Sequence, residues 1–161
     1  MKGGLNMFKG FFKKDTIEDP SLTMPLEGRI IPIEEVPDPV FSQKMMGDGF
    51  AIVPTNSTVV SPVNGKVISV FPTKHAINLL DDQGREILLH IGLETVALNG
   101  LGFTPFVKDG QKVKKGDRLM DVDFNTIKKK VPSIISSVVF TNLSDDEKVA
   151  ITKHGVEIKK K

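Results

Sequence analysis

Short β-type runs separated by turn residues are the feature that most constrains the fold of this chain. Runs rich in Val and Ile recur between residues 28 and 152, and Pro, Gly, Asn and Asp punctuate them. The runs are residues 28–33, 49–55, 58–63, 65–71, 76–80, 86–93, 136–142 and 149–152. Residues 122–130 and 145–149 alone favour short helical turns. The pattern predicts an all-β chain, an antiparallel β-sandwich or barrel with one or two helical turns.

Length and composition bound the class of protein. The chain has 161 residues with 39% hydrophobic content, which suits one domain with a core of its own. We expect that domain to span 21–161 and a flexible segment to span 1–20, with Met7 as the natural start. Basic and acidic residues number 22 and 20, so the charge gives no reason to expect nucleic-acid binding.

The sequence lacks cysteine and lacks any membrane-spanning or secretory segment, which excludes several classes of site and location. The chain has no cysteine, which excludes disulfides, thiolate metal sites and a cysteine nucleophile. It has no apolar run of about 18 residues and no secretory signal, so the cytoplasm is the expected location. Phenylalanines and lysines alternate between residues 8 and 14, which allows at most peripheral membrane contact. A solvated terminus is the favoured interpretation of that segment.

Two turn sequences predict β-hairpins. Asn64-Gly65 is a two-residue hairpin signal, because both residues tolerate positive φ. Residues 81–84 form a second loop. If the second hairpin is symmetric, His75 lies directly opposite His90, with Cβ atoms about 5 Å apart. A bulge at Gly84 would shift this pairing by one residue; we favour the symmetric register.

Two adjacent imidazoles admit several chemistries. Neither strand offers a nearby third ligand of the usual kind for a metal site. Packed core histidines, and a nucleophile with a charge-stabilising partner, are equally consistent with the residues. Thr73 is placed to fix the tautomer of His75, and Gly92 leaves room near His90 for a group as large as a phosphoryl. His154 lies in a polar turn and is interpreted as a surface residue.

The segment GREILLHIGLETV, Gly84–Val96, resembles the phosphorylation-site signature of the glucose-type IIA proteins of the bacterial sugar phosphotransferase system. The resemblance extends over residues 24–160 and includes PLEGRIIPIEEVPDPVF, GDGFAIVP, SPVNGKV, TKHAI and NGLGF. It implies a flattened antiparallel β-sandwich of the duplicated hybrid-motif type, with a single IIA domain over 21–161.

The resemblance implies roles for individual residues. His90 would accept a phosphoryl group on Nε2, His75 would stabilise it, and Thr73 would hydrogen-bond His75. Asp38 and Glu94 match acidic residues at the rim, although aspartate is more common in the family at the position of Glu94. The remaining binding residues that it implies are Val40, Phe41, Met46, Phe71, Leu88, Gly92 and Val96. Asn78 stands in this apolar collar where an aromatic residue is common.

The implied function is that of a phosphocarrier. It would take a phosphoryl group from phospho-HPr on His90 and pass it, in trans, to a cysteine on the IIB domain of a sugar permease. No cofactor is implied, although His75 and His90 could bind zinc together with a partner's carboxylate. The alternative is a regulatory binding module of the same fold that no longer transfers phosphate. Biotinyl or lipoyl carriers and lysostaphin-type zinc peptidases are disfavoured, because the carrier lysine triplet and the His-x-x-x-Asp pattern are absent.

Overall fold

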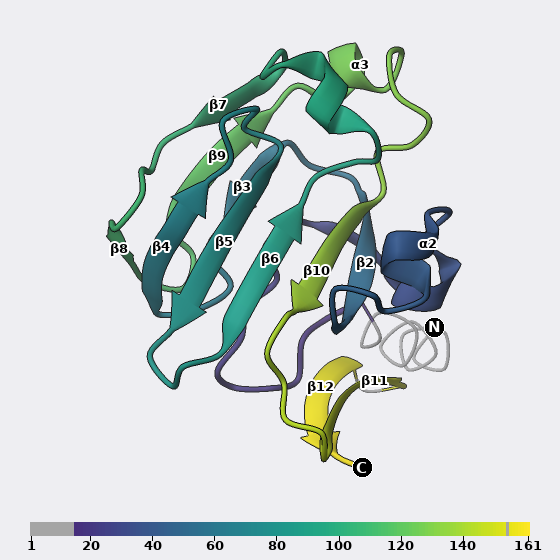
Figure 1. Cartoon of the computed structure of the whole chain (residues 1–161), viewed down its shortest axis with the longest axis vertical. Helices are drawn as coiled ribbons and strands as arrows, with labels where there is room; N and C mark the ends of the chain where they lie inside the picture. Colours follow the sequence, from purple (N-terminus) through teal and green to yellow (C-terminus); the bar gives the residue numbers. More distant parts are fainter. Residues whose placement is uncertain (1–14, 154) are drawn as a thin grey trace, which may run out of the picture.

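The structure is a computed structural model that describes residues 15–153 and 155–161. Its strands pair antiparallel in three sheets, which confirms the all-β prediction (Figure 1). A seven-stranded sheet has the order β1-β2-β10-β6-β5-β4-β8, a three-stranded sheet has the order β3-β9-β7, and β11 pairs with β12. The strands are β1 (Gly28–Pro32), β2 (Asp48–Pro54), β3 (Thr58–Val60), β4 (Gly65–Val70), β5 (Ala76–Asp81), β6 (Glu86–His90), β7 (Phe103–Pro105), β8 (Lys112–Val113), β9 (Arg118–Val122), β10 (Ser136–Phe140), β11 (Glu147–Thr152) and β12 (Gly155–Lys160).

The main core lies between the seven-stranded and three-stranded sheets. Alternate residues of the central strands point into it, and among the largest fully buried side chains are Phe50, Phe140 and Leu119. Each such side chain contributes about 1.5–3 kcal/mol of hydrophobic stabilisation. The period-two pattern of the sequence therefore marks the face of each strand that holds the sheets together.

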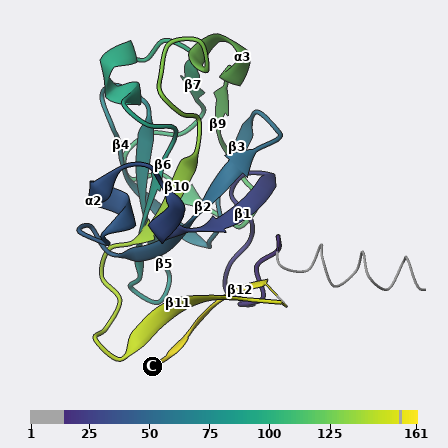
Figure 2. The same cartoon turned by 90° about the vertical axis from the view of Figure 1, so that its right-hand side faces the viewer.

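A second, smaller apolar cluster covers the opposite face of the seven-stranded sheet. It consists of Ile31, Ile33, Val36, Phe41, Ala51, Ala76, Leu88, Leu93 and Val139. The one-turn helix α2 (Pro39–Ser42) and the 3₁₀ turn η1 (Ile33–Glu35) lie on this face, and Figure 2 shows α2 on the side of the sheet away from β3. His90 ends β6 and lies on the same face of the sheet as Leu88.

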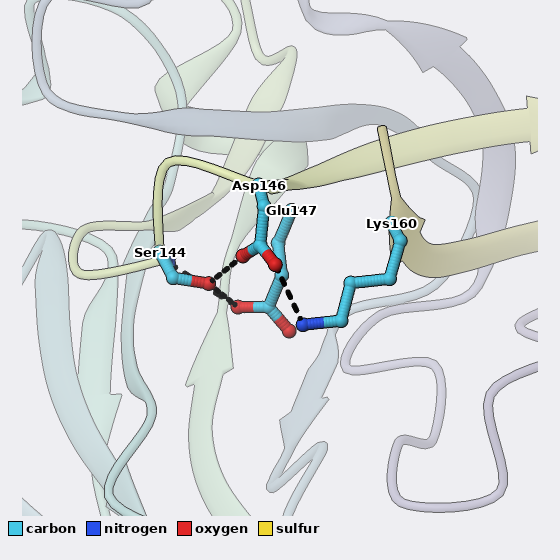
Figure 3. Close-up of polar contacts among 4 residues, drawn as sticks. All are labelled: Ser144, Asp146, Glu147 and Lys160. Atoms are coloured by element: carbon cyan, nitrogen blue, oxygen red, sulfur yellow. Dashed lines mark hydrogen bonds and ion pairs between the residues drawn. The ribbon is translucent and has the colours of Figure 1, made fainter.

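The two helical turns expected from the sequence have different outcomes. Helix α3 (Phe124–Ile127) lies within the first expected turn and is capped by the Asp123 side chain, which accepts from Thr126 N. The expected turn at 145–149 is wrong, because β11 begins at Glu147. Ser144 Oγ donates to Asp146 and Glu147, and Lys160 Nζ lies 3.0 Å from Asp146 Oδ2 (Figure 3). Side chains that hydrogen-bond locally in this way compete with a helix and favour a turn.

The hairpin expected at Asn64-Gly65 is also wrong. Strand β4 begins at Gly65 but pairs with β5 and β8, whereas β3 pairs with β9. A Cβ on Gly65 would lie 1.9 Å from the carbonyl oxygen of Leu80. Glycine is therefore required here for a close backbone approach, a need that produces the same dipeptide as a tight turn.

The N-terminal prediction falls mainly on residues 1–14, which lie outside the described residues. The flexibility of that segment, a start at Met7 and membrane contact stay predictions, as does the surface position of His154. Asp15 Oδ1 accepts from Ile30 N, and Ile17 forms a bridge with Val156 of β12. Pairing with the body of the domain thus begins ahead of residue 21. In the part of the chain that the structure describes, no helix is long and apolar enough to cross a membrane.

Candidate functional site

The candidate site forms around His90, where β6 ends. The side chain of His90 projects to the face that carries the smaller apolar cluster and is partly exposed. The Phe41 ring of α2 lies 4.8 Å from the His90 ring, centroid to centroid. The Asp38 side chain caps α2 by accepting from Val40 N at 2.9 Å, which fixes the turn that carries Phe41. A single capped turn therefore holds an aromatic ring against the imidazole.

The symmetric register expected for the two histidines is wrong, because β5 pairs with β6 one residue further along. Ala76, not His75, lies opposite His90. Gly84 has φ of +88°, and its N–H donates to Asp81 O, so the loop is longer by a bulged residue than the symmetric hairpin. Two Asp81 Oδ1 hydrogen bonds, from Gln83 N and Arg85 N, fix this loop.

The two imidazoles nevertheless lie side by side, 4.9 Å apart at their centroids and nearly perpendicular. His75 precedes β5 in a tight turn, in which Lys74 has φ of +64° and Lys74 N donates to Phe71 O. The alternation of a regular strand does not apply to such a turn, so the side chain can turn towards His90. The turn at Lys74, and not the register of β5 and β6, therefore brings the two imidazoles together.

Hydrogen bonds determine which ring nitrogens are free. His90 Nδ1 lies 2.9 Å from the carbonyl oxygen of Gly92. A carbonyl only accepts, so Nδ1 carries the proton, and in neutral His90 Nε2 has a free lone pair. His75 Nδ1 lies 2.7 Å from Thr73 Oγ1. The hydroxyl that was expected to fix the tautomer of His75 is thus in contact with that ring.

Burial favours the neutral form of both imidazoles, and in His90 repulsion from His75 adds to it. Burial lowers the pKa of His75, whose side chain is 5% exposed. Burial, and then the charge of His75, lowers the pKa of His90 to about 4, although the Gly92 carbonyl and the Asp38 carboxylate oppose the shift. At neutral pH His90 therefore presents an unprotonated Nε2, which is the form that attacks an electrophile.

The structure gives a reason for glycine at position 92 other than the expected room for a phosphoryl group. It adopts φ of +70°, and a Cβ there would lie 2.7 Å from the Thr95 side chain and 3.3 Å from Ser133 O. The glycine allows the backbone to turn so that its carbonyl reaches His90 Nδ1. Ser136 Oγ accepts from Gly92 N, and Thr95 Oγ1 donates to Ile91 O, which hold the turn in place.

The remaining collar and rim residues surround this centre at different depths. Leu88 is buried on the same face of β6, and Phe71 packs edge-on to His75 with ring centroids 5.6 Å apart. Val40, Met46 and Val96 are exposed at the surface. Asn78 is half-buried opposite Leu88. Glu94 is exposed, with φ of +57°, just before the 3₁₀ turn η2 (Thr95–Leu98).

Sequence reasoning missed some features of this region. Met45, beside Met46, is 69% exposed, the most of any large apolar side chain described. The role of the Gly92 carbonyl was missed too, because a backbone acceptor leaves no mark of its own in the sequence. Within residues 15–153 and 155–161, no group of three or more His, Cys, Asp and Glu side chains is arranged to hold a metal ion. Zinc shared with a partner's carboxylate stays a prediction.

Comparison with known proteins finds a matching family model and several similar proteins. Residues 20–146 match the family model described as phosphoenolpyruvate-dependent sugar phosphotransferase system, EIIA 1. The glucose-specific EIIA component of Oceanobacillus iheyensis is 51% identical over 145 residues, covering 89% of this chain and 88% of that protein. That of Halalkalibacterium halodurans is 54% identical over 119 residues, covering 74% and 69%.

Two further similarities concern a longer protein and a solved structure. The glucosamine-specific EIICBA component of Bacillus subtilis is 47% identical over 129 residues, which are 80% of this chain and 20% of that protein. The solved structure of glucose permease IIA from Mycoplasma capricolum superposes with a TM-score of 0.74 at 50% identity. The match covers 76% of this chain and 80% of that one.

Proposed function

The chain belongs to the EIIA 1 family of the phosphoenolpyruvate-dependent sugar phosphotransferase system, and from this premise we propose that His90 is the residue that carries its phosphoryl group. The protein is a phosphocarrier, a phosphotransferase with a phosphohistidine intermediate that passes the group to a IIB acceptor. The observation that carries the assignment of His90 is its Nδ1 hydrogen bond to Gly92 O, which leaves Nε2 as the nucleophile.

Acceptance of the phosphoryl group follows from this geometry. The Nε2 lone pair of His90 attacks the phosphorus of phospho-HPr, an Nε2–P bond forms, and the P–N bond to the donor histidine breaks. Both nitrogens are similar leaving groups, so the reaction needs alignment and charge stabilisation more than a strong driving force. His90 keeps its Nδ1 proton throughout, held by the Gly92 carbonyl.

In this proposal His75 donates a hydrogen bond to a phosphoryl oxygen, and Thr73 orients His75. If Thr73 Oγ1 donates to His75 Nδ1, then Nε2 of the neutral His75 carries the proton. The near-perpendicular packing of the two rings, 4.9 Å apart at their centroids, supports a role for His75 beside a group bound to His90. His75 then donates a hydrogen bond to a phosphoryl oxygen without being phosphorylated itself.

The surface around His90 suits brief docking of two successive partners. Val40, Met46 and Val96 give an apolar surface, and Asp38 and Glu94 add negative charge at its rim. Apolar contacts exclude water from the phosphoryl group, and a charged rim steers a basic donor. Phospho-HPr is the donor that this surface would meet, and the acceptor is a IIB cysteine, which must lie outside these 161 residues because they include no cysteine.

Location and further contacts follow as part of the proposal. Exchange with HPr places the chain in the cytoplasm. Contact of residues 1–14 with lipid, and regulatory partners on the same face, are compatible with this function and are not needed for it.

The assignment is tested by incubating the purified protein with enzyme I, HPr and phosphoenolpyruvate. Wild type is expected to take up one acid-labile phosphoryl group. His90→Ala should take up none, whereas His75→Ala should still accept the group but transfer it onward slowly. Uptake by His90→Ala at the wild-type level would reject His90 as the acceptor.

A further inference from the structure

Small residues flank His90 in a row that runs across four strands of the seven-stranded sheet. Across β5, β6, β10 and β2, the residues in register are Ala76, His90, Ser137 and Ala51. Side chains in register across a sheet share one face, with Cβ atoms about 5 Å apart. Ser137 is therefore the direct cross-strand neighbour of His90, on the face that Phe41 covers.

Ser137 differs from the other polar residues of this sheet. Its side chain is 1% exposed, and its Oγ has no hydrogen-bond partner. No other buried side-chain nitrogen or oxygen in the described ranges, 15–153 and 155–161, is left unpaired. The adjacent Ser136 points to the opposite face, where its Oγ donates to Ile134 O and accepts from Gly92 N.

A buried hydroxyl without a partner costs stability, because it loses its bonds to water and gains none in the protein. The site next to it is where charge appears during the reaction. When neutral His90 attacks through Nε2 and keeps its Nδ1 proton, the ring of the phosphohistidine becomes positively charged. The other charged or titratable groups that act on His90 are His75, which opposes this charge, and Asp38, which favours it.

We propose that Ser137 is a positioning residue whose hydroxyl oxygen turns towards the His90 ring and stabilises the positive charge that the ring acquires on phosphorylation. This inference rests on the proposed role of His90. The hydroxyl has no hydrogen bond to break when the charge develops. On onward transfer the Nε2–P bond breaks, its electron pair returns to Nε2, and the ring becomes neutral again with Nδ1 protonated.

The effect is the size of a weak contact between a dipole and a charge, about two- to fivefold in rate. Ser137→Ala is expected to lower kcat for transfer from phospho-HPr by this factor and to leave KM unchanged. It should also lower the pKa of Nδ1 in phosphorylated His90, followed by NMR. Ser137→Thr, which keeps a hydroxyl, should restore both quantities.

Ser61 offers a matched control. It is fully buried outside the site, and its Oγ donates to Val63 O at 2.7 Å. Ser61→Ala should lower the melting temperature and leave transfer unchanged, because it breaks a made hydrogen bond. Ser137→Ala should keep or raise the melting temperature and slow transfer.

Wild-type kcat and an unchanged titration in Ser137→Ala would overturn the inference, as would a change confined to KM. Ser137→Ala is expected to fold. Its kcat and its Nδ1 pKa therefore test the inference even if Ser137→Thr does not fold. Failure of the proposed function looks different, because wild type itself would then accept nothing on His90. In that case the pKa of unphosphorylated His90 in Ser137→Ala reports the same interaction, and an unchanged value would overturn it.

Discussion

Acid titration of His90 offers a sharp test of the electrostatics of the site. The ordinary pKa of a histidine is 6.5, and burial together with the charge of His75 lowers that of His90 to about 4. This gap corresponds to about 3 kcal/mol of differential stability between neutral and charged forms. The imidazole is expected to remain neutral from pH 8 down to about pH 5.

The sign of the effect on stability follows from proton uptake. Between about pH 6.5 and pH 4 the unfolded chain binds a proton at residue 90 that the folded chain does not. The free energy of unfolding therefore falls as the pH drops through this window, by up to about 3 kcal/mol from this residue alone. His90→Gln lacks this loss, so comparison with it removes the contribution of carboxylates.

Two measurements check the reasoning. NMR titration of the ring nitrogens gives the pKa of His90 directly, and His75→Gln should raise it because one source of repulsion is removed. Urea unfolding of wild type and His90→Gln at pH 7 and pH 4.5 gives the stability difference. A wild-type pKa near 6.5, together with equal losses of stability in the two proteins on acidification, would refute the account.

Other predictions concern single contacts. Thr73→Val removes the 2.7 Å contact to His75 and should slow onward transfer about two- to tenfold in single-turnover measurements, an effect absent when His75→Gln is the background. Gly92→Ala should cost about 1–2 kcal/mol from its φ of +70° and more from the contact with the Thr95 side chain, measured by urea unfolding. Gly84→Ala, with φ of +88° and no atom within 4 Å, should show the first cost only. Phe50→Ala should lower the free energy of unfolding by about 3–5 kcal/mol, because the ring is fully buried in the main core.

The fold was predictable where strands are long and alternate. In residues 76–80 and 86–93 every second residue, beginning at Ile77 and at Ile87, is apolar, and both segments contain strands of the central sheet. Strands β7 and β8 were missed because three and two residues are too short to show a period. Strand β12 was missed because its lysines and glutamate interrupt the apolar pattern.

Turns were the least predictable part. Asn64-Gly65 has the composition of a hairpin turn, yet the glycine is there because a neighbouring carbonyl leaves no room for a Cβ. The loop at 81–84 has two registers that differ by one residue, and residue types alone do not choose between them. The choice is made by the positive φ of Gly84 and by the Asp81 side chain, which accepts from two backbone N–H groups.

The site was predictable as residues but not as geometry. The resemblance named His75, His90 and Thr73, and the structure brings the three side chains together. It could not supply the turn at Lys74 that brings the histidines together, nor the carbonyl of Gly92 that sets the tautomer. Ser137 left no signal, because one serine within an apolar strand has no pattern of its own.

The role of His90 is tested most directly by finding which ring nitrogen is bonded to phosphorus in the phosphorylated protein. The protein is labelled with ¹⁵N at histidine, phosphorylated through HPr, and studied by NMR for coupling between phosphorus and ring nitrogen. We expect coupling to Nε2 of His90, with the proton retained on Nδ1. Coupling to Nδ1 of His90, or to either nitrogen of His75, would contradict it.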